Sequence, residues 1–286
     1  MGEILYGNEL ANEIKKDIKT KIDEKLELGK RKPQLAIICA VEDEGSTSYL
    51  LGLKKAGATI GIDVNVYDEF VDHSEKGVID KINELNMSND VDGIMIVLPL
   101  PKNYDAQRII NAVDYTKDVD GLCESNVGKL YTKQDGFKPC TPLGILHLLK
   151  ANNVELEGKE VVVLGRSNSV GKPMAQLLLD ENATVTICHS KTKNIMNISQ
   201  RADILVVAIG KGNLVTSDWV KENAIVVDVG VNVNNEGKLV GDVDIEDALT
   251  VAKWVTPVTK GVGTLTTAVL MGNVYKSYER RINDGI

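Results

Sequence analysis

The sequence predicts an α/β protein with two domains, each a parallel sheet covered by helices, and a C-terminal helix that returns to the first domain. Three observations predict this class. Apolar strands alternate with amphipathic helices through the 286 residues, which is typical of parallel sheets with right-handed crossovers. The length suits two domains of ordinary size. A run of β-branched residues at 161–163 breaks near Gly165 and resumes as a helix, which indicates a phosphate-binding turn.

The first domain opens with a helix over residues 8–28. Apolar residues recur there every fourth position from Leu10 to Leu26, which gives one apolar face, and Gly29 is a natural C-cap. Strands are predicted at 34–41, 63–70 and 93–100, and helices at 46–61, 74–85 and 105–113. The Pro-Cys-Thr-Pro segment at 139–142 ends this domain.

The second domain follows a connecting helix at 143–151. Its strands are predicted at 160–164, 183–188, 204–209, 224–229 and 254–258. A glycine-rich turn at 261–263 precedes the last helix, 265–281, which lies beyond the last strand and is therefore free to cross back. We expect residues 1–140 with 264–286 to form an N-terminal α/β substrate domain, and 141–263 to form a Rossmann-like dinucleotide-binding domain.

The dinucleotide assignment depends on the turn after the strand at 160–164. Gly165 permits a sharp turn, and the helix predicted at 174–179 would direct its free N–H groups at a pyrophosphate. The spacing departs from G-x-G-x-x-G, because Ser167 replaces the second glycine and the next glycine is Gly171. On this loop alone, a tight turn without a ligand stays an alternative.

The end of the next strand favours NADP over NAD, although NAD stays possible. An NAD enzyme usually carries an acidic residue about 20 residues after the first glycine, where it binds the ribose. Here residues 188–193 contain hydroxyls and cations but no carboxylate, and Arg166 adds a cation. These groups suit a 2′-phosphate. The alternative is that His189 and Lys191 are ordinary solvated loop residues.

Composition excludes several classes of function. A net charge of −8 and a pI near 5.1 argue against nucleic-acid binding. The four cysteines are scattered and the three histidines lie far apart, so we expect no disulfide framework and no metal site. There is no apolar run of membrane-spanning length and no signal-like N-terminus. We therefore expect a cytoplasmic protein without a membrane partner.

Seven motifs in order make nearly the whole chain resemble one family. They are Gly45–Tyr49, Pro99–Pro101, Lys117–Gly121, Pro139–Pro142, Gly165–Ser167, Val227–Gly230 and Gly241–Val243. In this order they resemble the bifunctional methylenetetrahydrofolate dehydrogenase/methenyltetrahydrofolate cyclohydrolase family. The resemblance implies NADP-linked oxidation of 5,10-methylenetetrahydrofolate, hydrolysis of the methenyl product to 10-formyltetrahydrofolate, a role in one-carbon metabolism, and a homodimer.

The resemblance also implies site residues. Tyr49 and Asp120 take the catalytic positions. The tetrahydrofolate substrate is placed at Tyr49, Leu53, Val97, Leu98, Pro99, Asp120, Thr259, Gly261 and Gly263. The dinucleotide is placed at Thr141, Gly165, Arg166, Ser167, Val170, Gly171, His189, Ser190, Gly230, Val231 and Thr266. Without the resemblance, Tyr49 could be a packing aromatic, Asp118 and Asp120 turn formers, and Asp228 a loop cap.

The sequence departs from the family pattern in four places. The family has a catalytic lysine four residues after the tyrosine, and here that residue is Leu53; Lys54 follows, rotated by about 100° around the helix. Val97 replaces a glutamine before Leu-Pro-Leu-Pro. The turn at 259–264 reads Thr-Lys-Gly-Val-Gly-Thr instead of Pro-Gly-Gly-Val-Gly-Pro. Leu143 replaces a basic residue after Cys-Thr-Pro.

These departures bear on the two reactions differently. Hydride transfer needs positioning of substrate and cofactor but no obligatory proton abstraction by the protein, whereas hydrolysis needs a positioned acid/base group. The sequence thus predicts an NADP-dependent dehydrogenase whose cyclohydrolase activity is weak or lost. The alternatives are a fully bifunctional enzyme in which Lys54 or another group substitutes, and a diverged NADP-binding protein with another substrate or no catalysis.

Overall fold

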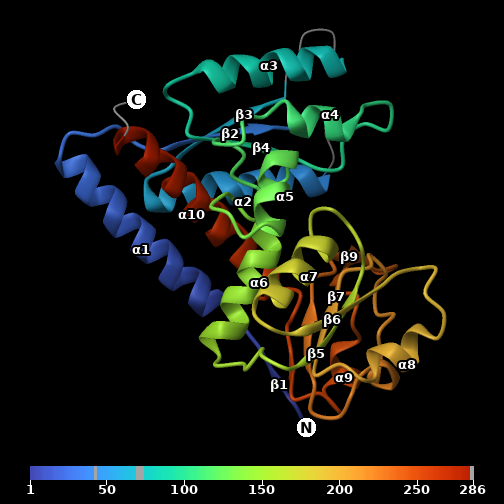
Figure 1. The fold of residues 1–286 in the computed structure, drawn as a ribbon. Coiled ribbons are helices and arrows are strands. Elements are labelled where there is room, and N and C mark those ends of the chain that lie inside the picture. The colour runs from blue at the N-terminus through green and yellow to red at the C-terminus, as the bar shows by residue number, and fades with distance from the viewer. Residues whose placement is uncertain (42–43, 69–73, 284–286) are drawn as a thin grey trace. The chain divides into compact units, whose positions relative to one another are not determined.

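The computed structural model describes residues 1–41, 44–68 and 74–283 (Figure 1). The chain forms two compact units. The large-sheet unit comprises Met1–Ala11 and Pro139–Thr266, and the small-sheet unit comprises Asn12–Lys138 and Thr267–Ile286. This confirms the two-domain α/β class. The domain boundaries at 140/141 and 263/264 stay a prediction, and residues 284–286 of that prediction lie outside the described residues.

The large-sheet unit contains a six-stranded sheet in which every pair of neighbours is parallel. Its strands are β1 (Glu3–Ile4), β5 (Glu160–Leu164), β6 (Thr184–Cys188), β7 (Ile204–Val207), β8 (Ile225–Asp228) and β11 (Trp254–Val255), in the spatial order β1-β11-β8-β7-β5-β6. After β5 the chain first goes to β6 on one side and then to β7 on the other. Ligands of open α/β sheets bind outside the carboxyl ends of the strands at such a switch point.

Several elements of this unit differ from the predicted ones. α6 (Cys140–Ala151) and α7 (Gly171–Asp180) both begin three residues earlier than predicted, because a proline is tolerated in the first turn of a helix. The structure also contains elements that were not predicted: the two-residue strand β1, α8 (Ile195–Ser199), α9 (Ile245–Ala248) and the hairpin of β9 (Asn232–Val233) and β10 (Leu239–Val240). These elements are too short for a periodic pattern.

The small-sheet unit contains three parallel strands, β2 (Gln34–Ile38), β3 (Asp63–Tyr67) and β4 (Gly93–Ile96), in the order β3-β2-β4. Its helices are α1 (Asn8–Glu27), whose first residues belong to the other unit, α2 (Glu44–Ile60), α3 (Glu75–Met87), α4 (Ala106–Asn111) and α5 (Glu124–Tyr131). Figure 1 shows α2 and α3 on opposite faces of this sheet. The predicted strand 63–70 ends earlier, and its residues 69 and 70 lie outside the described part of the chain.

The C-terminal helix α10 (Val262–Asn283) returns to the small-sheet unit, as predicted. Asn273 Nδ2 donates to the carbonyl of Val119 at 2.8 Å, and Ser277 Oγ donates to that of Thr116 at 2.9 Å. Near the end of the helix, the Tyr278 hydroxyl donates to the carbonyl of Arg31 at 2.7 Å. Among the described helices, none is long and apolar enough to cross a membrane.

Candidate functional site

Gly165 lies at the switch point of the large sheet, directly after β5. Its φ is +129° and its N–H donates to the carbonyl of Cys188, at the end of β6, at 2.9 Å. A Cβ atom here would lie 2.2 Å from the carbonyl oxygen of Ala208, just after β7. Only glycine therefore fits where the chain passes between two strand ends, which is the backbone geometry that a dinucleotide turn requires.

Ser167 stabilises the loop that follows. Its Oγ accepts hydrogen bonds from Val170 N at 3.1 Å and Gly171 N at 3.2 Å, while its carbonyl accepts from Lys172 N at 3.1 Å. A Cβ atom on Gly171 would lie 2.3 Å from the carbonyl oxygen of Gly165. The expectation of free N–H groups at the helix start was thus wrong for these three donors, because the serine that replaces a glycine binds them.

The turn after β6 presents polar groups at the same edge of the sheet. His189 Nδ1 accepts from Lys191 N at 3.1 Å, and Thr192 Oγ1 accepts from His189 N at 2.9 Å. His189 therefore holds the turn, while Ser190 and Lys191 are exposed, as is Arg166 on the neighbouring loop. Exposed hydroxyl and cationic groups without a carboxylate fit a phosphate group better than a ribose diol.

Asp228 ends β8 and is 3% exposed. Its carboxylate accepts N–H bonds from Gly230 at 2.9 Å and from Asp242 and Val243 at 3.1 Å each. Burial raises the pKa of Asp228 to about 6. The residue is a loop cap, as its alternative interpretation held, and it fixes the backbone just before Val231, whose side chain is 65% exposed.

Thr141 and Thr266, both predicted to contact the dinucleotide, lie together. Their hydroxyl oxygens are 2.9 Å apart, which joins the start of α6 to the start of α10. Gly144 permits this close packing, since a Cβ atom there would lie 3.1 Å from the Cβ of Leu265. The pair therefore has a structural role in addition to any contact with the cofactor.

The predicted substrate residues of the large-sheet unit lie in the turn before α10. Gly261 is buried, and its Cβ would lie 1.9 Å from the carbonyl oxygen of Pro257. Thr259 and Gly263 are exposed. Lys260, where the family pattern has glycine, adopts a left-handed φ of +62°. The turn thus keeps a conformation that favours glycine although the side chain has changed.

The remaining predicted substrate residues belong to the small-sheet unit. Val97 follows β4, is 6% exposed, and donates its N–H to the carbonyl of Ile38 at 2.8 Å. Leu98 and Pro99 come next and are exposed at the carboxyl end of the sheet. Since the valine side chain is buried, this edge presents apolar groups and main chain where the family has an amide.

The Lys117–Gly121 motif divides into structural and candidate residues. Lys117 Nζ donates to three carbonyls at the end of α3, those of Leu85, Asn86 and Ser88, at 2.9, 2.7 and 2.7 Å. Burial lowers the pKa of Lys117 to about 8. The Asp118 carboxylate accepts from Cys123 N and from Asn126 Nδ2, each at 2.9 Å. Asp118 is the turn former, and half-buried Asp120 stays the candidate for substrate binding.

Tyr49 and Lys54 lie five positions apart on helix α2 and therefore on different faces of it. Tyr49 is 37% exposed, whereas Leu53, one turn later, is 1% exposed. Lys54 is exposed and lines a cavity of about 240 Å³ together with Ser46 and Thr47; among the described residues that line this cavity, Tyr49 is absent. The helix therefore brings no amine to the position beside Tyr49 that the family uses.

Most of the predicted site residues that follow a strand lie at the carboxyl edge of the large or the small sheet. Gly165 to Gly171, His189, Ser190, Gly230 and Val231 follow strands β5, β6 and β8, so all lie at the carboxyl edge of the large sheet. Val97 to Pro99 lie at the carboxyl edge of the small sheet. Their roles in binding stay predictions. No group of three or more potential metal ligands occurs among the described residues.

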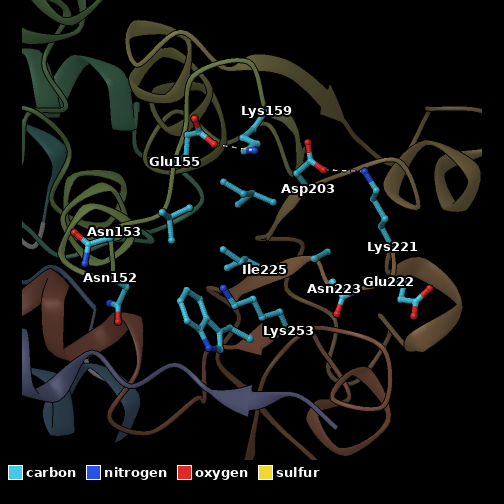
Figure 2. Close-up of a pocket in the computed structure, with 14 residues that line it drawn as sticks. Asn152, Asn153, Glu155, Lys159, Asp203, Lys221, Glu222, Asn223, Ile225 and Lys253 are labelled. Carbon is cyan, nitrogen blue, oxygen red and sulfur yellow. Dashed lines mark hydrogen bonds and ion pairs between the residues drawn. The ribbon is translucent and has the colours of Figure 1, made fainter.

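The cavity in Figure 2 lies at the opposite, amino edge of the large sheet. Its volume is about 320 Å³, and its rim carries the ion pairs Glu155–Lys159 at 3.1 Å and Asp203–Lys221 at 2.7 Å. None of the described residues that line it is a predicted site residue. Dinucleotide binding at the carboxyl edge therefore stays a prediction that does not involve this cavity.

Two family comparisons together cover most of the chain. Residues 5–120 match the family described as "Tetrahydrofolate dehydrogenase/cyclohydrolase, catalytic domain". Residues 139–282 match "Tetrahydrofolate dehydrogenase/cyclohydrolase, NAD(P)-binding domain". The order of the two matched domains agrees with the predicted order of substrate and dinucleotide domains.

Individual relatives agree with these matches. "Bifunctional protein FolD" of Oceanobacillus iheyensis is 45% identical over 284 residues, which cover 99% of each chain. The crystal structure of the bifunctional enzyme FolD from Campylobacter jejuni superposes with a TM-score of 0.94 at 41% identity, covering 98% of this chain and 100% of the other. The Trypanosoma brucei enzyme, solved with NADP cofactor and inhibitor, has a TM-score of 0.92 at 32% identity and 98% coverage of both chains.

Proposed function

Because the chain belongs to the tetrahydrofolate dehydrogenase/cyclohydrolase family, we propose that it oxidises 5,10-methylenetetrahydrofolate to the methenyl form with NADP and hydrolyses the product weakly or not at all. When bound, NADP accepts the hydride. The protein's task in this step is to bind and align both partners, because the methenyl cation forms without a proton being removed by a side chain.

The residues for that task are present in both units. Gly165 and Gly171 let the turn after β5 pack tightly against Ala208 and against its own backbone, and the exposed Arg166, Ser190 and Lys191 suit a 2′-phosphate. The NADP complex of the Trypanosoma brucei relative supports this choice. Asp120 would hold the pterin ring, and Tyr49 would line the pocket beside it.

The observation that carries the loss of hydrolysis is the burial of Leu53. Hydrolysis of the methenyl cation requires a group that moves protons while water attacks and the ring opens. At 1% exposure, Leu53 contributes only apolar atoms at the position of the family's lysine. The side chain of Val97 likewise offers no hydrogen-bonding group at the position of the family's glutamine.

A second candidate is the full bifunctional activity that gives several relatives their names. The exposure of Lys54 on the same helix favours it. Lys54, which lines a cavity together with Ser46 and Thr47, would then have to transfer the protons in place of the family's lysine. A cytoplasmic location stays a prediction from the sequence, and a homodimer stays a prediction from the resemblance.

Two assays on the purified protein test the proposal. The first follows NADP or NAD reduction with 5,10-methylenetetrahydrofolate, and the second follows the decay of methenyltetrahydrofolate above its uncatalysed rate. We expect NADP reduction with little accelerated decay. Fast decay that Lys54→Ala abolishes would establish the bifunctional alternative, and failure of both assays would indicate another substrate or no catalysis.

A further inference from the structure

Asp242 lies in the Gly241–Val243 motif, to which no role is assigned above, and is fully buried. Its Oδ2 accepts from Ile209 N at 2.7 Å and Gly210 N at 2.9 Å. Its Oδ1 accepts from Lys211 N at 2.7 Å and from Asn232 Nδ2 at 2.9 Å. Gly210, with φ of +65°, lets three successive N–H groups converge on one carboxylate, an arrangement known as an anion-binding nest.

This carboxylate also interlocks with the loop after β8. A Cβ atom on Gly230 would lie 2.3 Å from Cγ and 2.4 Å from Oδ1 of Asp242. In the opposite direction, a Cβ atom on Gly241 would lie 1.8 Å from Oδ2 of Asp228. Two buried carboxylates and two glycines therefore fix the spacing between the loops that follow β7 and β8.

The fixed loops adjoin the predicted dinucleotide turn. The carbonyl oxygen of Ala208, the residue before the segment 209–211, is the atom that leaves no room for a Cβ on Gly165. On the other side, Gly230 leads directly to the exposed Val231. A continuous set of contacts thus links Gly165, the segment 209–211, Asp242 and Val231 along the carboxyl edge of the sheet.

We propose that Asp242 is a positioning residue for the dinucleotide: its carboxylate holds the loops after β7 and β8 as one preorganised surface for the cofactor. The proposal deepens the proposed function and depends on dinucleotide binding at this edge. Burying a carboxylate is costly unless hydrogen bonds repay it. Four neutral N–H donors stabilise the carboxylate here. Because these hydrogen bonds already hold both loops, cofactor binding does not have to order either loop.

The variant Asp242→Asn tests the proposal directly. An amide offers one acceptor oxygen, so either orientation sets an NH₂ group against two N–H donors and loses two of the four hydrogen bonds. We expect the Kd for NADPH, measured by calorimetry on the full chain, and the KM for NADP to rise about tenfold or more. The KM for 5,10-methylenetetrahydrofolate should change by less than about twofold.

Two further variants separate positioning from general stability. Asn232→Ala removes a single donor to Asp242 from a half-exposed side chain, so it should fold normally and raise the Kd for NADPH about threefold. Asp203→Asn is the matched control, because Asp203 also accepts hydrogen bonds, from Glu160 N and Lys221 Nζ, but lies at the amino edge of the same sheet, away from the predicted cofactor site. It should lower the free energy of unfolding and leave the Kd for NADPH unchanged.

The outcomes are distinct. An unchanged NADPH affinity in Asn232→Ala, together with an unchanged affinity or no folding in Asp242→Asn, would overturn the proposal. An equal rise in the KM values for cofactor and folate would also overturn it. A wild-type protein that binds NADPH without oxidising the folate would contradict the proposed function but leave the comparison of Kd values valid. A wild-type protein that binds no dinucleotide would refute both.

Discussion

The carbonyl oxygen of Gly165 lies 2.3 Å from the point where a Cβ atom on Gly171 would be. The oxygen belongs to the backbone and a Cβ is fixed directly to Cα, so neither atom can yield without moving the turn or the start of α7. We expect Gly171→Ala to lower the free energy of unfolding by about 2 kcal/mol or more and to weaken NADPH binding. Urea unfolding and a fluorescence titration with NADPH measure the two effects.

Gly128 provides the matched control, since it lies in α5 and a Cβ there would meet nothing within 4 Å. Gly128→Ala should stabilise the protein by about 1 kcal/mol, because alanine has the higher helix propensity. If Gly171→Ala behaved like this control, the close approach of the turn to the helix would not exist in solution.

The second prediction concerns Leu53 and Val97, which replace the family's lysine and glutamine. Replacing them by the family's residues, as Leu53→Lys with Val97→Gln, should raise the rate of methenyltetrahydrofolate hydrolysis by about 100-fold, the lower range of general acid–base catalysis. The ammonium must extend from a buried helix position, so the variant should also unfold at lower urea. The assay is decay of the methenyl absorbance.

Lys54→Ala is the control for this prediction, because Lys54 is exposed and near the same helix position. It should leave the rates of oxidation and hydrolysis within about twofold of wild type, as most surface substitutions do. A double variant that folds and still oxidises the folate, but hydrolyses the methenyl form no faster, would show that other residues limit the hydrolysis.

The sequence predicted the two parallel sheets and the carboxyl-edge location of the glycine turn because both depend on local patterns. Strands such as β5 are continuous apolar runs, and a glycine follows where the chain must turn. The two-residue strand β1 could not be predicted, since its stability comes from pairing with β11, more than 240 residues later. Propensity does not report such pairings.

The sequence motifs indicate which residues belong to the candidate site, but they do not distinguish residues that stabilise a turn from residues that could bind a ligand. Asp118 and Asp120 are two apart in a turn and carry the same side chain, yet only the folded chain shows that the carboxylate of Asp118 accepts the N–H groups of Leu122 and Cys123. Asp242 was missed for a related reason. Its partners at 209–211 lie about 30 residues away in sequence, and only the folded loops bring them to one carboxylate.

Asp228 gives a prediction for the pH dependence of stability. Its ordinary pKa is 3.8, and burial raises the pKa in the folded protein to about 6. The folded state therefore binds more protons than the unfolded state between these values. The free energy of unfolding should fall as the pH rises from about 4 to about 6, by about 3 kcal/mol from this group, and stay constant above.

The variant Asp228→Asn isolates this contribution, since an amide does not titrate. Urea unfolding at several pH values should show the stability difference between wild type and variant decreasing by about 3 kcal/mol from pH 4 to 7. At every pH the variant loses an acceptor for Gly230, Asp242 or Val243. A difference that is constant with pH would mean that Asp228 does not titrate in this range.

Lys260 adopts a φ of +62° at the position where the family pattern has glycine. A left-handed conformation costs a residue with a Cβ about 1 kcal/mol relative to glycine, and the carbonyl of Lys260 is held there by a hydrogen bond from Gly7 N at 2.8 Å. We expect Lys260→Gly to raise the free energy of unfolding by about 1 kcal/mol.

Lys238→Gly is the control, because Lys238 is exposed and is not among the described residues with positive φ. This variant should not stabilise the protein. Equal urea midpoints for Lys260→Gly and wild type would indicate that the turn relaxes to another conformation in solution.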